Sequence, residues 1–175
     1  MTALYKTQSN RSAFFCTSRI FPIYLRIITA EVIILNDIEM LNCILQNAEM
    51  GCQGITNIRR MEHSMAVDRV LCDQLARYGR FYGAAHKMLT SRGEKAKHIS
   101  PVVKTMTRIA AGRDLQRDAS ASHIAEMMIK GSTMGVNKLV RRLRDYNRQN
   151  PGVTMLAKKM LDAEEEHIRE MRAFI

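Results

Sequence analysis

The sequence predicts an all-α protein that folds as an antiparallel four-helix bundle, and three observations lead to this fold class. Aromatic residues make up 6% of the chain, proline occurs only 3 times and tryptophan is absent, which favours helices over strands. The 13 methionines suit helix-on-helix packing, because their unbranched side chains fill irregular gaps. Four long segments repeat apolar residues at helical spacing and are joined by short connections. A chain of 175 residues can bury a substantial core as one domain.

The first helix of the bundle is expected from Ile38 to Met61. Asn36 is placed to cap it, and Glu39 can reach back to the cap residue. Apolar residues then keep helical spacing at Leu41, Ile44, Leu45, Ala48, Cys52, Ile55 and Ile58. The bundle is therefore predicted to occupy residues 37–175.

Residues 1–36 are expected to form a peripheral extension. Ser12–Leu35 is apolar but lacks a sustained helical or strand period. Three interpretations stay open: a poorly ordered extension, an accessory helix near Ile20–Ile34, or a translated stretch upstream of the native protein. The most apolar part, Phe21–Leu35, is short for a bilayer span and is interrupted by two charged residues, so no membrane span is expected.

The second helix is expected to start at Ser64 or Asp68, both good cap residues, and to stop near Gly93. After it, Ser100-Pro101 combines a cap residue with proline in the first helical position. This pattern predicts a short linking helix that packs outside the bundle and ends before Asp118.

The third helix is expected from about Ser122 to Asn147, and the fourth from Asn150-Pro151 to the C-terminus. The third carries Gly131 and Gly135 four residues apart. Glycine costs about 1 kcal/mol relative to alanine inside a helix, so a compensating contact is expected. We expect another helix of the bundle to approach closely at both glycines, with a dimer surface as the alternative.

Three segments of the sequence resemble a known family: Gln46–Gly51, Ser122–Gly135 and Asp162–His167. The chain is similar over about residues 37–175 to a family of uncharacterised bacterial four-helix proteins related to ferritin-like bundles. Ser122–Gly135 is the most specific part. The resemblance implies a ferritin-like bundle and carries no assigned activity.

Glu164 and His167 are the best-placed polar pair, because both fall on the apolar stripe of the fourth helix. Ferritin-like metal sites need a Glu from each of two helices and a Glu-x-x-His from each of the others, and only this helix has the motif. Ligation of iron, manganese or zinc would require Glu49 or His86 to converge on the pair. The favoured interpretation is structural: Glu164 pairs with a cation or with a polar group such as Gln74, and His167 is a satisfied histidine at a bundle end.

Because the formal net charge is +10, an acidic partner has to be considered. Basic residues of the third helix cluster opposite its apolar face, as in a solvated surface: Lys130, Arg141, Arg144 and Arg148. The sequence has no nucleic-acid-binding motif, so weak, non-specific binding at most is expected.

The four cysteines lack a metal-binding or disulfide spacing, so we expect reduced thiols in the cytoplasm. Cys52 lies on the core stripe, whereas Cys43 is expected to be accessible.

Nucleotide-binding and zinc-protease motifs are also absent from the sequence. We therefore expect a non-enzymatic protein that acts through association, as a homo-oligomer or with a protein partner. The alternative is a ferritin-like metal-binding or redox protein with a reduced ligand set.

Overall fold

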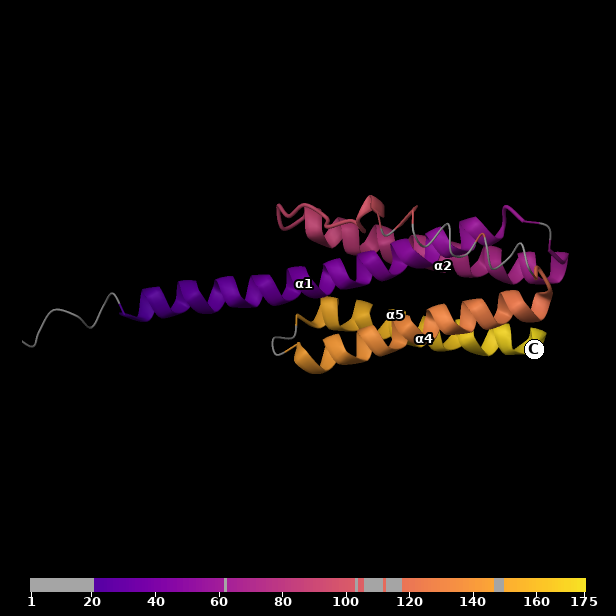
Figure 1. Cartoon of the computed structure of the whole chain (residues 1–175). Coiled ribbons are helices and arrows are strands. Elements are labelled where there is room, and N and C mark those ends of the chain that lie inside the picture. Colours follow the sequence, from indigo (N-terminus) through magenta and orange to yellow (C-terminus); the bar gives the residue numbers. More distant parts are fainter. Residues whose placement is uncertain (1–20, 62, 103, 106–111, 113–117, 147–149) are drawn as a thin grey trace, which may run out of the picture. The chain divides into compact units, whose positions relative to one another are not determined.

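The computed structural model describes residues 21–61, 63–102, 104–105, 112, 118–146 and 150–175. The chain divides into two compact units, Met1–Ile34 and Leu35–Ile175. Every regular element of the described residues is helical, and none is a strand. Four of these elements are labelled in Figure 1: α1 (Phe21–Ile58), α2 (Met65–Thr90), α4 (Ala121–Asp145) and α5 (Pro151–Met171). The short 3-10 helix η1 (Arg172–Phe174) follows α5.

Helix α1 differs from the expectation, because the predicted helix start at Asn36 is wrong. The helix begins at Phe21 and continues through Asn36. Pro22 lies in the first turn, where a missing N–H is tolerated, and no proline or glycine follows it before Gly51. An asparagine inside a helix costs at most about 0.7 kcal/mol, which is too little to end it. Although α1 is 38 residues long, no described helix is apolar enough over sufficient length to cross a membrane.

The other helix ends follow local sequence signals. The hydroxyl of Ser64 accepts a hydrogen bond from the N–H of Val67, so Ser64 rather than Asp68 caps α2. Gly93, which follows α2, has a φ of 75°, a conformation that favours glycine. Ser120 caps α4, and Asn150 caps α5. The predicted starts of the last two helices are thus confirmed to within about a residue.

The segment after α2 packs against α1 within the second unit. The N–H of Lys97 donates to Asn42 Oδ1 at 2.7 Å, and Gln46 Nε2 donates to the carbonyl of Lys97 at 2.9 Å. Residues 101–102 and 104–105 are helical, as the linking-helix prediction requires. Most of the remaining stretch up to Asp118 lies outside the described residues.

The core of the second unit is a cluster of apolar side chains from α1, α2, α4 and α5. The arrangement is consistent with a helical bundle, and burying each large aliphatic side chain contributes about 1.5–3 kcal/mol. Cys43 lies in this cluster at 6% exposure, so its predicted accessibility is wrong; burial raises the pKa of its thiol. The largest fully buried aliphatic side chains are Met40, Leu41, Ile44, Leu45, Ile55, Leu71, Leu89, Ile124, Leu139, Met160 and Met171.

Deleting residues 1–34 is expected to leave the second unit folded. The shortened helix would begin next to Asn36, whose side chain can then cap it while Glu39 completes the capping box. We expect the midpoint of thermal unfolding, followed by circular dichroism, to change by less than about 4 °C.

Asn36→Ala provides the control for that deletion. In the shortened chain it removes the cap and should cost about 1 kcal/mol. In the full-length chain Asn36 is inside α1, so alanine should be neutral or slightly stabilising. Loss of the cooperative transition after deletion would contradict the assignment of the core to residues 35–175.

A buried polar cluster beside a methionine-lined groove

Glu164 of α5 lies in the bundle interior at 1% exposure. Asn47 Nδ2 of α1 donates a hydrogen bond to its Oε1 at 2.9 Å, and the hydroxyl of Tyr78 of α2 donates to its Oε2 at 2.7 Å. Both carboxyl oxygens are therefore engaged by other helices. The polar partners of Glu164 are Asn47 and Tyr78 instead of the suggested Gln74, whose Nε2 donates to Glu170 and to the carbonyl of His167.

The environment of this cluster favours neutral side chains. Burial raises the pKa of Glu164, although its hydrogen bonds act in the opposite direction. Burial and the neighbouring Glu164 together raise the pKa of Tyr78. Burial lowers the pKa of His167 to about 4. The uncharged forms of all three side chains are thus stabilised relative to their charged forms.

His167 is buried at 1% exposure, but it is not the satisfied histidine that was expected. Neither ring nitrogen has a hydrogen-bond partner among the described residues. Its Nδ1 lies 3.9 Å from Glu164 Oε2, which is too far for a hydrogen bond. The ring packs edge-on against Tyr78, with 4.8 Å between ring centroids. His167 is therefore held by packing alone, and burying its imidazole without hydrogen-bond partners costs free energy of folding.

Glu49 is engaged elsewhere, on the side of α1 that faces the segment after α2. Its carboxylate forms an ion pair with Lys104 and accepts the N–H of Ile99 at 2.9 Å. Partial burial raises the pKa of Glu49, but the hydrogen bonds from Lys104 and Ile99 outweigh this and lower it. His98 Nδ1 lies 3.6 Å from the same carboxylate.

The remaining metal-ligand candidate, His86, is exposed on α2 and stacks on Tyr82. The structure thus brings together Glu164 and His167 of the four candidate ligands and does not bring Glu49 or His86 to them. Within the described part of the chain, no group of three or more His, Cys, Asp and Glu side chains could hold a metal ion.

The two glycines of α4 have different surroundings. A Cβ at Gly135 would lie 2.7 Å from Glu164 Oε1, closer than real Cβ contacts, and 3.0 Å from Asn47 Nδ2, which is also tight. The expected close approach is therefore confirmed at Gly135, where the polar cluster occupies the space of a side chain. A Cβ at Gly131 would meet nothing within 4 Å, so the prediction of close packing there is wrong. Gly131 lies on an open groove instead.

This groove, which we call the methionine groove, is a cavity of about 410 Å³ formed mainly by α1 and α4. Its lining residues are Asn47, Met50, Gly51, Gly54, Ile58, Tyr78, Met127, Met128, Gly131, Ser132, Met134, Gly135, Lys138 and Glu164. Glu164 and Tyr78 are its buried wall, whereas Met134, at 61% exposure, and Gly131 lie where it opens to the surface. Four methionines make it apolar, and Gly54 and Gly131 leave open space between the helices.

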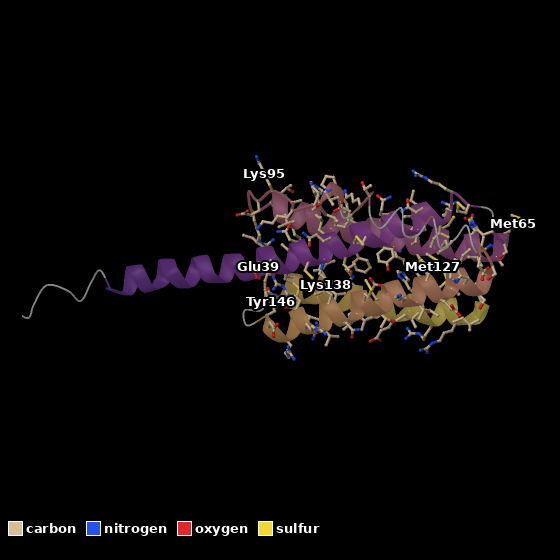
Figure 2. The ribbon with its side chains drawn as sticks, in the orientation of Figure 1. Glu39, Met65, Lys95, Met127, Lys138 and Tyr146 are labelled. Carbon is tan, nitrogen blue, oxygen red and sulfur yellow. The ribbon has the colours of Figure 1, made fainter. Side chains whose placement is uncertain are left out.

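A second, polar cavity of about 750 Å³, the basic groove, adjoins the first and shares Met134 and Lys138 with it. Its lining residues are Glu39, Asn42, Cys43, Gln46, Lys97, Met134, Asn137, Lys138, Arg141, Arg142 and Asp145. Together the two grooves form what we call the α1/α4 seam, marked in Figure 2 by Glu39 on α1 and by Lys138 and Met127 on α4.

Sequence reasoning missed Asn47 as a member of the cluster, and it also missed Ser132, whose hydroxyl lies 3.5 Å from that of Tyr78. A signal for both was nevertheless present. Asn47 follows the core residue Ile44 by three positions, and Ser132 follows Met128 by four, so helical spacing places both on core faces. Both residues are buried although they are polar. A polar residue on an otherwise apolar helix face indicates a buried hydrogen-bonding site.

Comparison with known proteins adds no relative from which a role could be carried over. No protein-family model matches the chain, and neither a curated protein nor a solved structure matches it at a significant level. Fold and site together define a helical protein with a buried polar cluster and a surface groove.

Proposed function

We propose that the protein is a non-enzymatic helical-bundle protein that acts by associating with a protein partner, which docks in the methionine groove. The bundle is proposed to be antiparallel and ferritin-like, because short connections join α1 to α2 and α4 to α5. Its proposed location is the cytoplasm, in keeping with the cysteine pattern of the sequence.

The exposure of methionine along an open apolar groove is the observation that carries this proposal. Met134 is 61% exposed although apolar space lies beside it, and Met127 is half-buried. Flexible methionine side chains adapt to the shape of a partner and recur at surfaces that bind helices. Gly54 and Gly131 leave open space where a side chain would otherwise fill the groove. A partner side chain that entered there would gain burial without displacing the core.

The polar cluster supports a structural role for its carboxyl group. Each oxygen of Glu164 accepts a hydrogen bond from a different helix, so this side chain ties α1 and α2 to α5. His167 lies against Tyr78 and does not line the groove. We propose that these residues hold the wall of the groove in place while the methionines bind the partner.

Met134→Asp is expected to weaken partner binding about tenfold, because it places a charge in the apolar part of the groove. Met155→Asp is the matched control: Met155 is 56% exposed on α5 and does not line either groove. The measurement is quantitative co-purification of proteins from nuclease-treated extract of the source cells. Nuclease treatment removes the non-specific nucleic-acid binding that a basic surface supports.

We expect at least one protein that the wild type and Met155→Asp retain equally and that Met134→Asp retains about tenfold less, with the helical circular dichroism of all three unchanged. The proposal would be contradicted if the Met134→Asp variant retained every protein as well as the wild type does.

A further inference from the structure

We infer that the segment docking in the α1/α4 seam is an amphipathic helix of a protein partner, whose apolar side chains enter the methionine groove and whose acidic side chains meet the basic groove. This inference rests on the proposed function and adds the chemistry of the partner. It follows from the continuity of the seam, its length and the distribution of its charges.

The seam has the length of a helix. Its lining residues extend from Glu39 to Ile58 on α1 and from Met127 to Asp145 on α4. At 1.5 Å per residue, each stretch is about 28 Å long, which corresponds to about five helical turns. The shared residues Met134 and Lys138 make the apolar and basic parts continuous, so one helix can contact both.

The charges of the basic groove are unbalanced. Its two acidic residues already have arginine partners: Glu39 Oε2 lies 2.7 Å from Arg142, and Asp145 Oδ1 lies 3.3 Å from Arg144. Three cations of its lining have no ion pair within the described part of the chain: Lys97, Lys138 and Arg141. All three are exposed. Acidic side chains of a docked helix would complement these cations, so the groove should favour an acidic partner helix over a basic one.

Charge also argues against a second copy of this chain as the occupant. The formal net charge of +10 means that another copy brings like charge to an already basic surface. A small apolar acid would fill the methionine groove and reach Lys138, but it would leave most of the seam empty. An acidic amphipathic helix matches the methionine groove with its apolar face and the basic groove with its acidic side chains, along the whole length of the seam.

The test uses two fluorescein-labelled 18-residue peptides and the full-length protein. Both peptides carry leucines at positions i, i+3, i+4 and i+7 of a helix, and their polar face is glutamate in one and lysine in the other. In fluorescence anisotropy we expect the glutamate peptide to bind at least about tenfold more tightly at physiological salt. The difference should shrink as salt is raised, since exposed charges are screened within about 8 Å at 0.15 M.

Variants assign the binding to the seam. Lys138→Glu should weaken binding of the glutamate peptide about tenfold and leave that of the lysine peptide unchanged or tighter. Lys158→Glu, an equal charge change at an exposed position of α5 outside both grooves, should have little effect. Met134→Asp should weaken binding of the glutamate peptide, and Met155→Asp should not.

The possible failures are distinguishable. Equal binding of the two peptides that still depends on Met134 overturns the charge inference and leaves the proposed function standing. Peptide binding that is insensitive to Met134, or no peptide binding, overturns the inference, and the co-purification experiment then decides the proposed function separately. If laurate binds in a Met134-dependent way and neither peptide binds, the occupant is a small acid and not a partner helix. If the protein forms a Met134-dependent dimer in sedimentation equilibrium, the occupant is a second copy of the chain.

Discussion

Acidification from pH 6.5 to about 4 is expected to remove about 3 kcal/mol of the free energy of unfolding through His167 alone. Burial lowers the pKa of this imidazole from 6.5 to about 4, so between these values the unfolded chain binds a proton that the folded chain does not. The stabilisation from a neutral His167 is therefore complete above pH 6.5 and is lost as the pH falls through the folded pKa.

Charges around His167 modulate this effect. Glu170 and Glu166 raise its pKa, and Arg77 lowers it, but burial is the largest cause. Glu164 acts with the opposite sign: its raised pKa gives a contribution that is complete below pH 4.5 and lost as the pH rises through the folded value. Glu164→Gln should therefore make the acid-induced loss of stability steeper.

Urea unfolding at several pH values between 4 and 7 measures the effect. His167→Leu conserves most of the side-chain volume and removes the titrating group, so its free energy of unfolding should change little across this range. His86→Gln, at an exposed histidine, should keep the wild-type dependence. An unchanged pH dependence in His167→Leu would exclude His167 as the cause.

Gly135→Ala and Gly131→Ala are expected to change stability in opposite directions. At Gly135 the added methyl overlaps Glu164 Oε1 and crowds Asn47 Nδ2. Overpacking of this kind typically costs about 1–3 kcal/mol, and here it also disturbs a buried hydrogen bond. At Gly131 the methyl meets open space, so helix propensity should raise stability by about 0.5–1 kcal/mol.

Thermal and urea unfolding of the two variants, together with the wild type, provide the comparison. Because both substitutions are glycine to alanine in the same helix, the change in backbone entropy is matched, and the difference reports the surroundings. A Gly135→Ala protein as stable as Gly131→Ala would show that α1, α4 and α5 can separate without cost at the cluster.

Local features of the sequence determined the ends of most helices. Ser64 and Asn150-Pro151 each specify a helix start through side-chain and backbone geometry within a few residues, and the structure confirms both. The helical spacing of apolar residues likewise placed Glu164 and His167 inside, where they are buried. Asn36 shows the limit of such signals, because a cap residue starts a helix only where the chain before it is not already helical.

Only the tertiary structure decided which groups meet. Asn47 and Glu164 are 117 residues apart in sequence, and Tyr78 and Glu164 are 86 apart. Their contact depends on how far each helix is shifted along its axis relative to the others, and periodicity within one helix carries no information on that shift. The same shift places Gly135 against the cluster and leaves Gly131 on a groove. Glu49 is kept from Glu164 for another reason, because it lies two residues beyond Asn47 and therefore on the side of α1 that faces the segment after α2. Packing between helices set these differences, because side chains distant in sequence fill or leave empty the space beside each glycine.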